Sequence, residues 1–276
     1  MKKLFLTWAI LAGFALGANS QEAIVEQENL IFDTDAEKEL WHSGHQDVFR
    51  LFRAVQATNS VSESNWDELV KELDAMASKQ EDELKFLRQI FQKTHQRLLR
   101  KYEQHSSFNS MLEDGKFDCV SGSAAIGMFL NRYGYKFEVV ETDYHVFVVT
   151  QIKDKQIILE STLPVGGMIT TPSEVEAYLD SYKPEKFAQL KKLNQTIAGP
   201  NIDYSDNAIF RKVTLLELAG LQYYNDAIVH FNAQAYGKAV HQLSKAYLLY
   251  PSDRIDGLRD LSIDLAYKTY GYDVRK

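Results

Sequence analysis

The chain has 276 residues, a hydrophobic content of 45% and a formal net charge of −7. The acidic balance argues against a nucleic-acid partner, because phosphate binding needs concentrated Lys and Arg. There is one cysteine, so internal disulfides are excluded, and the hydrophobic content suffices for a sizeable core without them.

The first 20 residues have the features of a cleaved signal peptide. Lys2 and Lys3 precede an uncharged apolar run, Leu4 to Ala18, and the small residues up to Ser20 suit signal peptidase. The run is too short to span a bilayer comfortably. We therefore expect an exported protein, periplasmic or secreted, that is cut after Ser20 and has no membrane span in the mature chain. A retained N-terminal anchor is the alternative.

Residues 21–104 are predicted to form a helical N-terminal region, with the pattern running from Glu37 to about Ser106. Apolar residues recur at helical spacing in three segments, and a polar break at 58–65 separates the first two. These residues are Val48, Leu51, Phe52 and Val55, then Trp66, Leu69, Leu73 and Met76, then Leu84, Leu87, Ile90, Phe91, Leu98 and Leu99. Ser64 or Asn65 is the expected cap of the second helix.

Residues 105–172 have a different character. Segment 105–118 is rich in Ser, Asn, Asp and Gly and is predicted to be a loop. An apolar helix with small residues is predicted from Cys119 to Tyr133, and Gly134 ends it. Three runs rich in Val, Ile and Phe follow, at 136–142, 145–152 and 156–161. Their close spacing predicts an antiparallel sheet.

Residues 173–215 are predicted to be a mixed linker region, and residues 216–276 to be helical. Within the last segment several residues fall at the spacings of a tetratricopeptide repeat, namely Phe231, Tyr236, Ala239, Leu243, Ala246 and Pro251. This resembles one repeat followed by a further helix. Because a lone repeat is a weak signal, an ordinary helical hairpin packed on the main domain stays open as the alternative.

Three residues at the ends of predicted elements could form a nucleophilic site. Cys119 opens a helix, where free backbone N–H groups and the helix dipole favour a thiolate. His145 begins one strand and Glu160 ends the next, so in an antiparallel hairpin they lie nearly opposite each other. A thiol, a base and a group that orients the base form a catalytic triad. Asp118 and Asp143 flank these residues, and either could replace Glu160.

Each triad residue also has a structural interpretation. A single Cys in an apolar helix can be an inert core thiol, and a His or Glu at a strand end can be an ordinary polar residue. His42 and His45 could share a helical face, but no third metal ligand accompanies them, so we interpret them as exposed histidines and predict no metal site.

The segments that carry the triad are Gly115-Lys116-Phe117-Asp118-Cys119, Tyr144-His145-Val146-Phe147 and Leu159-Glu160-Ser161-Thr162. They resemble the transglutaminase-like superfamily, in which a Cys leads a core helix, a His starts one strand and an acid follows on the next. The resemblance covers about residues 100–172. It implies an α+β fold with a helical N-terminal part, a core of a buried helix plus a small antiparallel sheet, and a C-terminal helical hairpin.

The resemblance implies a thiol acyl-transfer enzyme that acts on a peptide or protein amide of the cell envelope and needs no cofactor. Hydrolysis is favoured over cross-linking, because water is the default acceptor in an open site. The alternative is a catalytically inactive member that binds a peptide or protein. Glu160 in place of the family's usual Asp, and the absence of recognisable oxyanion residues, favour that alternative.

Overall fold

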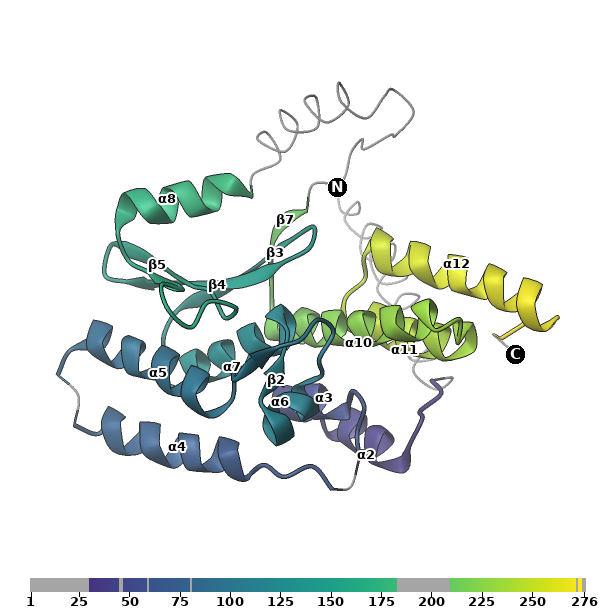
Figure 1. The fold of residues 1–276 in the computed structure, drawn as a ribbon, viewed down its shortest axis with the longest axis horizontal. Coiled ribbons are helices and arrows are strands. Elements are labelled where there is room, and N and C mark those ends of the chain that lie inside the picture. The colour runs from purple at the N-terminus through teal and green to yellow at the C-terminus, as the bar shows by residue number, and fades with distance from the viewer. Residues whose placement is uncertain are drawn as a thin grey trace, which may run out of the picture.

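The computed structural model shows a mixed α+β protein in which helices surround a small antiparallel sheet (Figure 1). It describes residues 30–44, 47–58, 60–79, 81–182, 209–271 and 273–274. The expected signal peptide lies outside these ranges. Among the helices described, none combines the length and the apolar character needed to cross a bilayer.

In the described residues four helices form the N-terminal part, and three of them lie in the segments whose apolar periodicity predicts helix. They are α2 (Asp35–Gly44), α3 (Val48–Ala54), α4 (Ser64–Ala77) and α5 (Glu83–Arg97). Asp47 caps α3 and Asp82 caps α5, each through a side-chain oxygen that accepts a backbone N–H of the first turn. The prediction of a cap at Ser64 or Asn65 is wrong, because Glu63 occupies that position and makes no side-chain cap bond. Helix also ends at Arg97 rather than near Ser106, since short strand β1 (Lys101–Tyr102) follows.

Segment 105–118, which was expected to be a loop, contains helix α6 (Phe108–Asp114) and short strand β2 (Lys116–Phe117). Ser107 caps the helix, and Gly115 ends it in the left-handed conformation at φ 68°. Strand β2 pairs in parallel with β1. The loop prediction failed because two turns of helix are too short to show a periodicity among so many polar residues.

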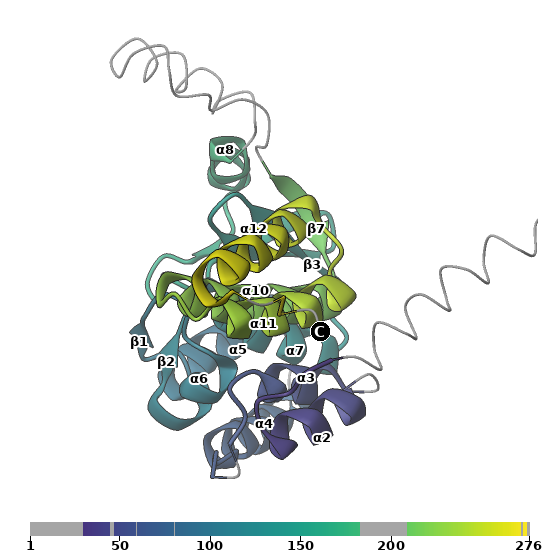
Figure 2. The same cartoon turned by 90° about the vertical axis from the view of Figure 1, so that its right-hand side faces the viewer.

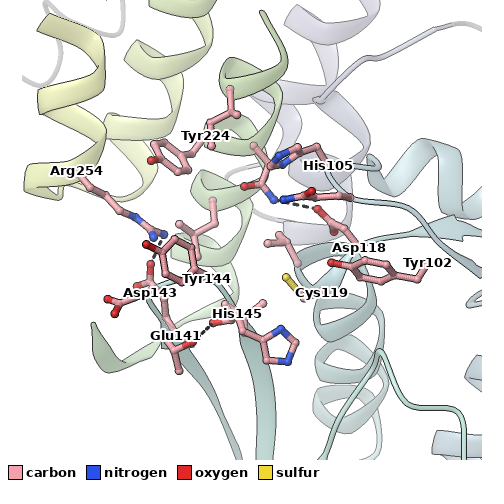
Figure 3. Close-up of a pocket in the computed structure, with 17 residues that line it drawn as sticks. Tyr102, His105, Asp118, Cys119, Glu141, Asp143, Tyr144, His145, Tyr224 and Arg254 are labelled. Carbon is pink, nitrogen blue, oxygen red and sulfur yellow. Dashed lines mark hydrogen bonds and ion pairs between the residues drawn. The ribbon is translucent and has the colours of Figure 1, made fainter. Parts of the chain in front are cut away.

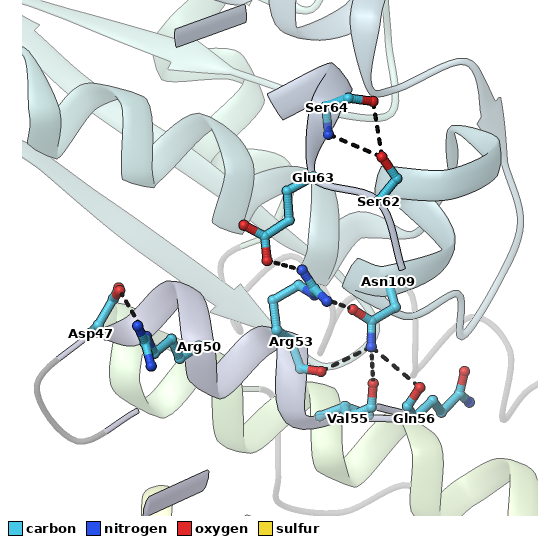
Figure 4. Close-up of polar contacts among 9 residues, drawn as sticks. All are labelled: Asp47, Arg50, Arg53, Val55, Gln56, Ser62, Glu63, Ser64 and Asn109. Carbon is cyan, nitrogen blue, oxygen red and sulfur yellow. Dashed lines mark hydrogen bonds and ion pairs between the residues drawn. The ribbon is translucent and has the colours of Figure 1, made fainter. Parts of the chain in front are cut away.

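A buried polar cluster fastens α3 to α6 (Figure 4). Arg53 donates to Asn109 Oδ1 at 2.7 Å and pairs with Glu63. Asn109 Nδ2 in turn donates to the carbonyls of Arg53 and Val55, both at 2.9 Å. Arg53 and Asn109 are buried, so these bonds replace the water that both side chains lose on folding. The cluster anchors the chain shortly before the candidate nucleophile.

Helix α7 (Cys119–Arg132) lies at the centre of the fold, as predicted. Asp118 and Ser121 form a capping box at its start. Its small residues let neighbouring elements approach closely: a Cβ on Gly122 would lie 2.9 Å from the Ser161 side chain. The segment that carries Glu160 therefore packs directly on the first turn of α7.

The sheet has the order β6-β5-β4-β3-β7, and every neighbouring pair is antiparallel. Its strands are β3 (Phe137–Thr142), β4 (Val146–Ile152), β5 (Lys155–Leu159), β6 (Met168–Ile169) and β7 (Phe210–Val213). The predicted meander of three strands is thus confirmed. The two outer strands were not predicted, and β7 comes from segment 173–215, which was expected to be a linker.

Both faces of the sheet are covered, which explains why its central strands are apolar without alternation. Helix α7 packs on one face. Helix α8 (Pro172–Ser181) packs on the other face through a small second core (Figure 1). That core consists of Val140, Phe147, Val149, Ile158 and Val175.

Three helices follow β7, namely α10 (Leu215–Asn232), α11 (Tyr236–Leu249) and α12 (Asp253–Tyr270) (Figure 2). Helix α10 packs against α11, α7 and α3, and α12 packs against α11. A buried ion pair between Lys245 and Glu37, with Nζ 2.5 Å from Oε1, ties α11 to α2. The C-terminal helices therefore belong to the same body as the sheet and the N-terminal helices.

Candidate functional site

Cys119 and His145 line one cavity of about 340 Å³ (Figure 3). Its walls come from distant parts of the chain: Tyr102 from β1, the first turn of α7, the β3–β4 turn, Tyr224 from α10 and Arg254 from α12. The volume is at the low end of the range for small-molecule pockets. The C-terminal helices thus form one wall of the site.

Asp118 holds the start of α7 in place. Its carboxylate accepts from the backbone N–H and the hydroxyl of Ser121, both at 2.8 Å, and from Asn225 Nδ2 at 2.9 Å. The last bond links the helix start to α10. Cys119 is therefore held in the wall of the cavity by a local cap and by a contact across the fold.

His145 and Glu160 form a hydrogen-bonded pair, with Nε2 2.6 Å from Oε2. Glu160 is 1% exposed and also accepts from the backbone N–H and hydroxyl of Thr162, at 2.9 and 2.7 Å, and from the hydroxyl of Tyr178. Burial alone would raise the pKa of Glu160, but the hydrogen bonds from His145, Thr162 and Tyr178 outweigh it and lower the pKa below its usual value. Glu160 is thus a carboxylate at neutral pH. It can only accept, so His145 Nε2 carries a proton and Nδ1 is the free nitrogen.

Asp118 and Asp143, the two other acids near the predicted triad, make hydrogen bonds with groups other than His145. Asp118 is the cap of α7, and Asp143 accepts the backbone N–H of Ile209 at 2.5 Å. Glu160 is the carboxylate that contacts His145. The backbone carbonyl of His145 accepts from the N–H and hydroxyl of Thr142, at 2.8 and 3.0 Å, which fixes the turn that presents the imidazole.

The ionisation of Cys119 differs from the sequence-based expectation of a thiolate. Burial raises the pKa of the Cys119 thiol to about 12, and the negative charges of Asp118 and Glu160 add to the rise. A backbone hydrogen bond from Val146 works in the opposite direction and places the sulfur beside the residue that follows His145. In the free protein Cys119 is therefore a protonated thiol at neutral pH.

Two further side chains near the thiol supply hydrogen-bond donors. Tyr102 and Gln104 both line the cavity. Burial is the largest cause that raises the pKa of Tyr102 to about 12, and the negative charges of Asp118 and Glu160 add to the rise. Its hydroxyl thus stays protonated and can donate to an oxygen bound in the cavity (Figure 3).

The opposite end of the cavity holds a cluster around Glu141, which is buried. Its carboxylate pairs with Arg211 at 2.7 Å, with Arg254 and with the hydroxyl of Tyr250. The Arg254 guanidinium also lies over the ring of Tyr224, 4.9 Å from the centroid. This cluster joins β3 and β7 to α11 and α12, so it fixes the wall that the C-terminal helices contribute.

Several residues of the site have no signal in the sequence. Tyr178, Asn225 and Arg254 come from helices far along the chain and reach the site only through packing. Thr162 could have been found, because a side-chain oxygen that accepts the backbone N–H two residues later is a common local turn.

Metal binding has no support in the described part of the chain, where three or more His, Cys, Asp or Glu side chains nowhere gather around a common point. His42 lies against the ring of Phe32, 5.8 Å between centroids. His45 lies outside the described residues, so the pairing of these two histidines stays untested.

No protein-family model matches this chain, and none of the curated proteins or solved structures compared with it gives a match. The function must therefore be inferred from the geometry and chemistry of the site itself.

Proposed function

We propose that this protein is a transglutaminase-like thiol acyl-transfer enzyme that uses Cys119 as nucleophile, His145 as base and Glu160 as the group that orients the base. The observation that carries the proposal is the buried His145–Glu160 pair, 2.6 Å between Nε2 and Oε2, whose imidazole shares one cavity with a thiol at a helix start. The order of the three residues along the chain, and the elements that present them, support the resemblance to the superfamily.

In the first half of the reaction, Cys119 Sγ attacks the carbonyl carbon of an amide while His145 Nδ1 takes the thiol proton. Glu160 stabilises the imidazolium that forms. The C–N bond then breaks, the imidazolium proton passes to the leaving amine, and a thioester on Cys119 remains. The backbone N–H of Cys119 and the hydroxyl of Tyr102 are the donors available to the negative oxygen of the intermediate.

In the second half, water attacks the thioester, with His145 as base. The proton that water loses returns to the sulfur through His145, and a carboxylic acid leaves. We favour water over an amine as acceptor because the His145 side chain is 20% exposed, so solvent reaches the base. An amine at the same position would give cross-linking.

A protonated thiol is compatible with this mechanism. In the serine triad the hydroxyl is also protonated before attack, and its proton moves to the imidazole as the bond to the substrate forms. The raised pKa of Cys119 therefore predicts that His145 is needed in the attack itself, not only in the resting state.

The expected substrate is a peptide or protein amide. The signal peptide expected at residues 1–20 supports an activity in the cell envelope or outside the cell.

The test uses p-nitrophenyl acetate, a generic acyl donor, with the purified protein. We expect a burst of nitrophenolate and an acetyl group on Cys119, detected by intact mass and peptide mapping. Both should disappear in Cys119→Ala and in His145→Ala. His42→Ala, which changes an exposed histidine, is the matched control and should behave as the wild type. Acetylation of Cys119 that persists unchanged in His145→Ala would show that the thiol reacts without His145 and would contradict the proposal.

The second candidate is a catalytically inactive domain of the same architecture that binds a peptide or protein in the cavity. One observation favours it: burial and two nearby carboxylates disfavour the thiolate, the reverse of what a resting thiol nucleophile usually has. This candidate predicts no burst and no acetylation of Cys119 in the wild type.

A further inference from the structure

Helix α8 brings two tyrosines to the His145–Glu160 pair from the far face of the sheet. Tyr178 and Tyr182 are one helical turn apart, so both point the same way. The hydroxyl of Tyr178 donates to Glu160 Oε2, and the ring of Tyr182 stacks on the imidazole of His145 with 6.1 Å between centroids and 24° between planes. Phe147 contacts both tyrosine rings, at 5.0 and 5.4 Å between centroids, and supports them.

We propose that Tyr178 and Tyr182 are positioning residues of the site: Tyr178 fixes the carboxylate of Glu160, and Tyr182 fixes the plane of the His145 ring. The inference rests on the proposed function for its catalytic consequence. The positioning itself can be measured without any substrate.

The hydrogen bonds of Glu160 explain why Tyr178 matters. The carboxylate has about four lone-pair sites. Thr162 fills two of them at Oε1, and His145 and Tyr178 share Oε2. Burial and the negative charge of Glu160 raise the pKa of Tyr178, so its hydroxyl stays a donor throughout the neutral range. Without Tyr178 the carboxylate would lose one of the contacts that set its direction toward His145.

Tyr182 constrains a different movement. The imidazole of His145 can turn about its Cβ–Cγ bond unless its ring is packed. The ring of Tyr182 lies nearly parallel to it, 6.1 Å between centroids, and restricts this rotation, so Nδ1 keeps the orientation that the bond to Glu160 defines. This is the kind of support that holds a catalytic geometry within about 0.5 Å.

Other titratable groups act on the same pair from every element packed around it. Besides the two tyrosines of α8, the charge of Glu160 interacts with His95 of α5, with Tyr102 of β1 and with Cys119 of α7. None of these three groups changes in a Tyr178 variant. The side chain of Tyr178 also hydrogen-bonds with Tyr182, so Tyr182→Phe is the comparison that separates this contact from the one to Glu160.

The experiment follows the imidazole of His145 by NMR, with the resonances assigned by comparison with His145→Gln. In Tyr178→Phe the carboxylate of Glu160 loses one of the contacts that direct it toward His145, so the Nε2–H of His145 should exchange faster with solvent and its proton signal should broaden. Tyr267→Phe, at a tyrosine 61% exposed on α12, is the matched control and should leave this signal unchanged.

The second comparison separates the ring of Tyr182 from its hydroxyl. Tyr182→Phe keeps the stacked ring and should retain the wild-type line shape of the His145 resonance. Tyr182→Leu should broaden or split that resonance as the imidazole gains freedom. In the acetylation assay Tyr182→Leu and Tyr178→Phe should each slow the burst on the order of tenfold, with little effect on the concentration of ester needed for half-saturation.

The outcomes distinguish the two proposals. An unchanged Nε2 proton signal of His145 in Tyr178→Phe, together with an unchanged line shape in Tyr182→Leu, overturns the positioning role even if the enzyme is active. Changes in both, with no acetylation of the wild-type protein, establish the positioning role and reject the catalytic function. Circular dichroism and thermal melting show whether each variant is folded.

Discussion

Replacing Asp118 with Asn tests whether a buried carboxylate helps to keep the Cys119 thiol protonated. Burial is the largest cause of the raised thiol pKa, and the charge of Asp118 is the second. An Asn at this position keeps an oxygen that can accept the backbone N–H of Ser121, so the start of α7 is preserved while the charge is removed. The bond from Asn225 loses its charged acceptor, so we expect a loss of about 1 kcal/mol in the free energy of unfolding.

The size of the effect follows from the fraction of thiolate, since the thiolate is the species that alkylates. The pKa of about 12 lies three pH units above the ordinary 9.0. At pH 7.5 native Cys119 should therefore react with iodoacetamide about 1,000-fold more slowly than the same residue in the urea-unfolded chain. Removing the charge of Asp118 should lower the thiol pKa and speed the native reaction, because the rate rises about tenfold for each unit by which that pKa falls.

The assay measures the rate of iodoacetamide labelling by intact mass between pH 6 and 10. Native wild type should gain about tenfold in rate per pH unit over the whole range, because the thiol titrates above it. A rate that is already high at pH 6 to 7 and levels off below pH 8 would refute the reasoning. It would show that Cys119 is a thiolate paired with His145 in the resting protein.

Three further predictions concern the carboxylate of Glu160, the packing around Gly122 and the stability of the fold at low pH. Glu160→Gln should reduce the rate of Cys119 acetylation by about two orders of magnitude or more, because a neutral amide does not stabilise the imidazolium, and the burst assay measures this. Gly122→Ala should lower the free energy of unfolding by about 1–3 kcal/mol in urea titrations, since its Cβ would lie 2.9 Å from the Ser161 side chain; Gly257→Ala, with open space around its Cβ, should instead stabilise α12 by about 0.5–1 kcal/mol. Burial lowers the pKa of His95 from 6.5 to about 4, so the unfolded chain takes up its proton first and the native state loses about 2 kcal/mol between pH 7.5 and 5. His95→Leu should remove that loss, and equal pH dependence of the urea midpoint in both proteins would contradict the assignment.

Local signals in the sequence predict the centre of the fold well. The helix from Cys119 is apolar, starts at a capping residue and ends before a glycine, so its limits are readable from neighbouring residues. The strands around His145 are close together and rich in β-branched residues, which favours a meander. His145 and Glu160 could be identified as partners because both lie next to strands that pair antiparallel.

Elements that depend on distant partners could not be predicted in the same way. Strand β7 is short and its two central residues are exposed. It is a strand because Phe210 to Val213 pair with β3, about seventy residues earlier. Tyr178 also depends on a distant partner. No residue near it in the chain indicates that its hydroxyl donates to Glu160, since the two meet only because α8 packs on the sheet.

The state of the nucleophile shows the difference most clearly. The sequence by itself determines that a thiol stands at the first position of a helix, where the dipole favours the thiolate by about 0.3–1 kcal/mol. Only the tertiary structure decides how far that thiol is buried and which charges face it. Burial can move a pKa by several units, and here Asp118 and Glu160 act in the same direction. The effect of burial and of the two carboxylates on the thiol pKa is larger than that of the helix dipole. The pattern along the chain therefore identifies the residues of the candidate site, and the packing around them sets their ionisation.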